Sequence, residues 1–242
     1  MEEPVGHCDY DGNGKISFEE AHAYAILTSR NIDIPVKTSG AFLRVHSRLH
    51  SEKEEEEGLL GLETPYSVIL ERAGKVDRAV LEGLSRRLDL KGENRGTQSR
   101  DGVSALAKKI RKVEEEKKAH KKKFDSARGV LSRDLRNRWP DLENRYSPGA
   151  IRLLSKEKRQ SQFVSAVEEH PRFEEWSKLR AERSKLSDRD LQLSKEYASW
   201  RRFLRAFENV AYAANLPVIC GEDVIGTYMW ILAAEQEGFS GN

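Results

Sequence analysis

The sequence has few apolar residues and no long apolar run, which argues against a membrane-spanning protein. Hydrophobic residues make up 38% of the 242 positions and charged residues make up 34%, against roughly 45–50% apolar, counting glycine, and about 25% charged in ordinary globular chains. No apolar run approaches the roughly 18–20 residues that a membrane-spanning helix requires. We therefore expect a soluble chain of long, solvent-exposed helices.

Cysteine is scarce as well, and neither sign of charge is in large excess. Cys8 and Cys220 lie near opposite ends of the chain without a CxxC pair, so neither a disulfide framework nor a zinc knuckle is predicted. The 42 Lys and Arg residues nearly balance the 40 Asp and Glu residues, for a net charge of +2. A global attraction to nucleic acid or to an anionic membrane is not indicated. The acidic start of the chain also lacks the pattern of a secretory signal.

The signatures of common enzyme classes are missing. The sequence contains no GxxxxGK[ST], GxGxxG, GxSxG or HExxH motif, which are the usual phosphate-binding, dinucleotide-binding, nucleophile and zinc-protease patterns. His46 and His50 are four residues apart, but no third ligand accompanies them. We assign no catalytic residue and expect a protein that is not an enzyme.

One short segment carries a pattern specific to a metal. Residues 9–20 read DYDGNGKISFEE and match the twelve-residue EF-hand loop in length and register. Calcium takes six to eight oxygen ligands, and the loop needs glycine at position six for a sharp bend; here that residue is Gly14. The sequence therefore predicts a Ca²⁺ site. The predicted ligands are the side chains of Asp9, Asp11, Asn13, Ser17 and Glu20 and the backbone carbonyl of Lys15.

In this loop the chain resembles the EF-hand calcium-binding superfamily. The resemblance implies a helix on each side of the loop, but only eight residues precede Asp9 and they include Pro4 and Gly6, so the entering helix is truncated. No second loop of this kind occurs, which leaves Ile16 at loop position eight without a partner. The alternative interpretation is an acidic turn before a helix, because Asp, Asn and Gly also favour turns without metal.

A fainter resemblance extends from Ser17 to Val36 and rests on the strings SFEEAHAYA and IDIPV. This stretch is similar to the region that follows the catalytic domain in some bacterial caspase- or legumain-like proteins. The resemblance implies a histidine and a cysteine nucleophile on an α/β domain, for which this chain has no room. His7 and Cys8 are adjacent, which is poor geometry for a dyad. The chain would then be a C-terminal remnant of a larger peptidase.

The rest of the sequence predicts helices joined by short breaks. A helix begins at Thr64 and Pro65, and apolar residues follow at steps of three and four as far as Leu88. Residues 91–102 include three glycines and no apolar residue, so we interpret them as a linker. Residues 32–36 are predicted to be extended, because alternation and a proline disfavour helix.

Two long segments, 103–138 and 176–211, have the alternating three-and-four spacing of a coiled-coil seam. At 1.5 Å per residue they extend roughly 55–60 Å, and the prolines between them reverse the chain, so we predict an antiparallel helical hairpin. Aromatic residues in 197–212 are predicted to close a small core with 218–232. Polar residues that interrupt the seam, and that are expected to set its register by pairing across the hairpin, are Lys117, His120, Arg183 and Asp190.

One basic stretch, Lys108–Lys123, holds nine basic and three acidic residues. No aromatic or glycine residues lie between the basic ones, so we interpret this stretch as a solvated helix face and do not expect nucleic-acid binding.

Together these patterns predict a mainly α protein, in which a short EF-hand-like loop and helix precede further helices and a long antiparallel coiled-coil hairpin. The predicted function is calcium binding through the single loop. The alternative is a coiled-coil scaffold that binds a protein partner or itself, with a structural or relic loop. The predicted segments are a calcium-binding segment at 1–50, an acidic linker at 51–63, an amphipathic helix and linker at 64–101, the hairpin at 102–214 and a C-terminal cap at 215–242.

Overall fold

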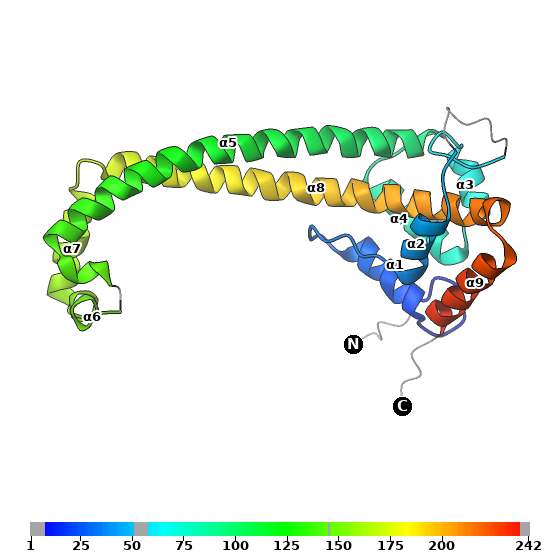
Figure 1. Ribbon diagram of the computed structural model, residues 1–242, viewed down its shortest axis with the longest axis horizontal. Coiled ribbons are helices and arrows are strands. Elements are labelled where there is room, and N and C mark those ends of the chain that lie inside the picture. The colour runs from blue at the N-terminus through cyan, green and yellow to red at the C-terminus, as the bar shows by residue number, and fades with distance from the viewer. Residues whose placement is uncertain (1–7, 51–57, 145, 238–242) are drawn as a thin grey trace. The chain divides into compact units, whose positions relative to one another are not determined.

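The computed structural model describes residues 8–50, 58–144 and 146–237, and these residues form helices without a β-strand (Figure 1). The predicted mainly α fold is confirmed. None of the described helices is long and apolar enough to cross a membrane. The elements in chain order are α1 (Phe18–Thr28), α2 (Thr38–His46), α3 (Tyr66–Arg72), α4 (Lys75–Arg87), α5 (Arg95–Arg138), the 3-10 helix η2 (Pro140–Glu143), α6 (Pro148–Ser155), α7 (Glu157–Glu168), α8 (Phe173–Ile219) and α9 (Glu222–Gln236).

The chain divides into two compact units. Unit 1 combines Met1–Lys108 with Leu193–Asn242, and unit 2 is Lys109–Gln192, so α5 and α8 each contribute to both. The first part of the predicted acidic linker, residues 51–57, lies outside the described residues.

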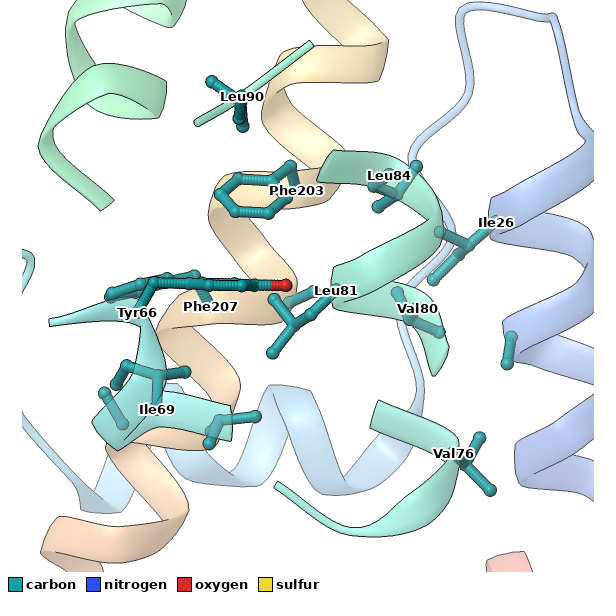
Figure 2. Packing of buried hydrophobic residues seen from close by; sticks show 14 residues of the cluster. Ile26, Tyr66, Ile69, Val76, Val80, Leu81, Leu84, Leu90, Phe203 and Phe207 are labelled. Carbon is teal, nitrogen blue, oxygen red and sulfur yellow. The ribbon is translucent and has the colours of Figure 1, made fainter. Parts of the chain in front are cut away.

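The core of unit 1 forms where α8 meets α1, α3 and α4. Phe203 and Phe207 of α8 are fully buried, and the Phe203 ring lies 6.4 Å from the ring of Tyr66 in α3 (Figure 2). Leu81 and Leu84 of α4 are also fully buried in this cluster. Burial of each such side chain contributes about 1.5–3 kcal/mol, so this cluster is the main source of stability in unit 1.

The prediction that these aromatic residues pack against residues 218–232 was wrong. Phe203 and Phe207 pack against α3 and α4 and not against residues 218–232, where Val218 and Trp230 are exposed. Hydrophobic spacing identifies which face of a helix is buried, but it does not identify the helix that covers that face.

The predicted single helix from Thr64 to Leu88 is two helices. Helix α3 ends at Arg72, and Gly74 is the N-cap of α4 in an extended conformation (φ −61°, ψ 168°). Glycine has a low helix propensity, and it divides an apolar pattern that otherwise continues without a change of period. The segment 32–36, predicted to be extended, lies outside any helix or strand.

The predicted linker at 91–102 was also wrong over most of its length, because α5 begins at Arg95. Two glycines that suggested a linker are sites of close packing. A Cβ atom at Gly96 would lie 2.3 Å from the carbonyl oxygen of Leu62, and one at Gly102 would lie 2.4 Å from the ring of Trp200. These glycines allow α5 to approach its neighbours within unit 1.

Replacement of Gly96 by alanine is expected to lower the free energy of unfolding by about 1–3 kcal/mol, because the added methyl group overlaps a backbone carbonyl. The matched control is Gly129→Ala in the same helix, where a Cβ meets nothing within 4 Å. Alanine at that position is expected to stabilise the protein by about 0.5–1 kcal/mol through helix propensity. Urea unfolding measures both variants, and equal effects at the two positions would contradict the close packing of Gly96.

Unit 2 contains an antiparallel pairing of α5 with α8. Val113 and Phe124 of α5 are buried in the seam, and the Phe124 ring lies 6.4 Å from that of Trp176 in α8. The seam residue Lys117 donates to Asp190 at 2.6 Å. Of the four polar seam residues that were expected to pair across the hairpin, these two therefore do so.

The other two polar seam positions do not pair with each other. His120 lies 3.3 Å from a carboxylate oxygen of Glu182, and the guanidinium of Arg183 lies 5.0 Å from the centre of the Phe124 ring. The reversal between the arms consists of η2, α6 and α7, where Trp139 and Phe163 make an edge-to-face contact at 5.4 Å.

Candidate metal site

The loop that precedes α1 wraps around the carboxylate of Asp9. This carboxylate accepts hydrogen bonds from the backbone N–H groups of Gly12 (2.8 Å), Asn13 (3.0 Å) and Gly14 (2.8 Å). Gly12 and Gly14 have φ values of +77° and +78°, in the left-handed region that glycine adopts at no steric cost. The two glycines therefore turn successive N–H groups toward one carboxylate.

Glu20 closes the loop from the first turn of α1. Its side chain is fully buried. One carboxylate oxygen accepts from the N–H groups of Tyr10 (2.7 Å) and Asp11 (3.2 Å), and the other accepts from the N–H (2.9 Å) and hydroxyl (3.0 Å) of Ser17. Ser17 is the N-cap of α1 and accepts from the Glu20 N–H in return, which completes a capping box.

Three of the six predicted ligands converge. Carboxylate oxygens of Asp9, Asp11 and Glu20 lie within 4.8 Å of one another, and no other group of three or more metal-ligating side chains occurs in the parts of the chain that the structure describes. Two of the other predicted ligands, Asn13 and Ser17, are hydrogen-bonded to these carboxylates. The amide of Asn13 donates to Asp11 at 2.8 Å and accepts from the Lys15 N–H at 2.8 Å.

Hydrogen-bond donors in the loop favour the ionised forms of Asp9 and Glu20. Burial raises the pKa of Glu20, but hydrogen bonds from Ser17, Asp11 and Tyr10 outweigh burial and hold the pKa below its ordinary value of 4.5. The N–H of Gly14 likewise lowers the pKa of Asp9. A carboxyl group with a depressed pKa in the folded state stabilises the fold above its unfolded pKa, and that stabilisation is lost as the pH falls through the folded pKa.

The donor set is of the kind that a hard divalent cation takes. All the side-chain donors are oxygen atoms, which a hard cation prefers, and three carboxylates this close repel one another unless positive charge or N–H groups face them. The four hydrogen bonds to Glu20 already occupy the two lone pairs of each oxygen. Coordination by Glu20 would therefore replace some of these bonds, and the Ser17 hydroxyl is the donor that is freest to rotate.

Two lysines that the sequence did not single out hold the loop region from outside. Lys75, at the start of α4, donates from Nζ to the backbone carbonyl of Asp11 at 2.8 Å. Lys37, just before α2, binds the carboxylate of Glu19, the residue that precedes Glu20. No local pattern marks either lysine, because both act on residues that are distant in the sequence.

The remaining candidates from the sequence form no site among the described residues. Cys8 is buried and Cys220 donates from Sγ to the carbonyl of His46 at 3.0 Å, and both are free thiols. His7, the other member of the adjacent histidine and cysteine pair, lies outside the described residues.

Comparisons with protein-family models, with curated proteins and with solved structures found no match to this chain. The resemblances to EF-hand and caspase-like proteins therefore rest on residues 9–36 alone.

Proposed function

We propose that the chain binds one calcium ion through the loop formed by residues 9–20. The observation that carries this proposal is the convergence of the carboxylates of Asp9, Asp11 and Glu20 within 4.8 Å, at the loop positions that supply calcium ligands in EF-hands. The left-handed turns at Gly12 and Gly14 support it, because they give the loop a sharp bend at position six.

Calcium would act here by ordering the chain and not by chemistry. The side chains of Asp9, Asp11, Asn13, Ser17 and Glu20, with the carbonyl of Lys15, would hold the ion. Since Glu20 belongs to the first turn of α1 and is joined to its N-cap, an ion that binds Glu20 also restrains the start of this helix. The proposal therefore predicts that calcium stabilises the loop and α1 together.

Titration calorimetry of the metal-stripped full chain tests the proposal, with magnesium as competitor and circular dichroism recorded alongside. We expect one calcium per chain with a dissociation constant of about 10⁻⁶–10⁻³ M, the range from sensor sites to weak extracellular modules. Magnesium is expected to compete poorly, because it demands a tighter octahedral geometry. Absence of heat up to millimolar calcium would overturn the proposal in favour of an acidic capping turn.

A second candidate function is the binding of a protein partner by unit 2. It is favoured by apolar side chains that unit 2 leaves in solvent, including Ile151 at 56% exposure and Leu191 at 48%. Because the seam itself is filled by α5 and α8, a partner would bind outside it. A concentration-dependent mass in light scattering that Leu191→Asp abolishes would support self-association through the face of α8 that carries Leu191, whereas a constant monomer mass would exclude self-association.

A further inference from the structure

We infer that the calcium loop is coupled to the C-terminal helix α9 through the buried ammonium group of Lys37, so that Lys37 and Glu235 are positioning residues of the site. The inference rests on the proposed calcium function and adds a regulatory connection to it. The elements concerned, α1, α2, α4 and α9, all belong to unit 1 (Figure 1).

Lys37 is the centre of a cluster of charges from three helices, in which Glu19 and Glu235 are largely buried and Asp77 is 33% exposed. The side chain of Lys37 is 8% exposed and binds Glu19 of α1, while oxygens of Asp77 in α4 and Glu235 in α9 lie 3.8 and 3.9 Å from Nζ. Glu19 is adjacent in sequence to Glu20, the residue that closes the calcium loop. The ammonium group therefore joins the first turn of α1 to α9.

Glu235 also caps another helix. Lys37 is the N-cap of α2 but makes no side-chain capping bond. Instead the buried carboxylate of Glu235 accepts from the N–H of Ser39 at 2.8 Å and from its hydroxyl at 2.6 Å. A carboxylate at a helix N-terminus satisfies donors that lack an intrahelical partner and interacts favourably with the helix dipole.

The contacts of Lys37 with Glu19 and Glu235 depend on one another because these three charges are largely buried. Burial lowers the pKa of Lys37, but the carboxylates of Asp77, Glu19 and Glu235 outweigh burial and raise it above 10.5, so the ammonium group stays charged. Removal of one member of such a cluster leaves the others without full compensation. If α9 leaves, Lys37 loses a carboxylate, α2 loses its cap, and the first turn of α1 loses part of its support.

Coupling of this kind acts in both directions. Calcium that fixes Glu20 restrains Glu19 and Lys37 and thereby favours the docked position of α9, and docked α9 preorganises the loop for calcium. Thermodynamic linkage requires the two effects to be equal in free energy.

Hydrogen exchange of the full chain, with and without calcium chloride, tests the first direction. We expect calcium to slow amide exchange in residues 222–236 as well as in the loop and α1. Amides in residues 109–138 of unit 2 serve as the internal control and are expected to exchange at unchanged rates. Protection confined to the loop and α1 would overturn the coupling while leaving calcium binding intact.

Calcium affinity of Glu235→Gln tests the second direction, with Glu237→Gln as the matched control. Both variants remove one negative charge at the end of α9, but Glu237 is exposed whereas Glu235 is 5% exposed. We expect Glu235→Gln to weaken calcium binding about 5-fold or more, with little change in Glu237→Gln. Equal affinities in wild type and both variants would overturn the coupling, and a wild type that takes up no calcium would overturn the proposed function itself.

Discussion

Replacement of Glu20 by glutamine is expected to weaken calcium binding by about 100-fold or more. The variant keeps the size and shape of the side chain but removes a charged ligand from a group in which only three carboxylates converge. Attraction between a divalent ion and a carboxylate at ligand distance amounts to several kcal/mol even when it is strongly screened, and each 1.4 kcal/mol is a tenfold change in affinity. Titration calorimetry measures the loss directly.

The control for this experiment is Ser17→Ala. It breaks the capping box of α1, which costs about 1 kcal/mol of stability, but it leaves all three carboxylates in place. We expect calcium affinity to fall about tenfold or less in this variant. Circular dichroism identifies any loss of helix in the Glu20→Gln and Ser17→Ala variants. If Glu20→Gln binds calcium as well as wild type does, the loop is a capping turn and not a metal site.

Replacement of Arg202 by methionine is expected to lower the free energy of unfolding of the protein by about 1.5–3 kcal/mol. Arg202 is 2% exposed, and its guanidinium donates to the carbonyls of Ser29 (2.7 Å), Asn31 (3.1 Å) and Asp33 (2.5 Å). Methionine fills much of the same volume but removes these hydrogen bonds, and a hydrogen bond to a charged group contributes about 1.5–3 kcal/mol. Because Asn31 and Asp33 are exposed residues, water can replace part of what the guanidinium donates.

Arg201→Met provides the comparison for this effect. Arg201 is the next residue of the same helix, its side chain is 30% exposed, and its partner Glu208 lies 3.8 Å away. A partly exposed ion pair of this length contributes about 0–1 kcal/mol, so urea unfolding should separate the two variants. Similar losses at both positions would show that the segment after α1 does not depend on the Arg202 guanidinium.

Much of this protein could be predicted from its sequence. The loop at 9–20, the two long helices and the chain reversal between them all follow from patterns that repeat within a few residues. The sequence also predicted that polar seam residues pair across the hairpin, and Lys117 and Asp190 do so, although the pattern did not say which residues pair. Local periodicity and turn chemistry determine these features because they depend on neighbours along the chain.

Only the tertiary structure decided which surfaces meet. By sequence Gly96 is typical of a linker, but in the structure it packs against the carbonyl of Leu62. Phe203 and Phe207 pack against α3 and α4, which the sequence did not indicate. Lys37 and Arg202 are typical surface residues by type, yet both are buried.

The physical reason is the same for all of these residues. Whether a charge or a glycine can be buried depends on donors, acceptors and free space supplied by segments far away in the chain, such as the carbonyl of Asp33 that Arg202 reaches 169 positions earlier. The sequence by itself therefore determined the EF-hand-like pattern of residues 9–20 and the helices. The packing of distant segments decided where the helices begin and end, what covers the aromatic residues, and which charges support the loop.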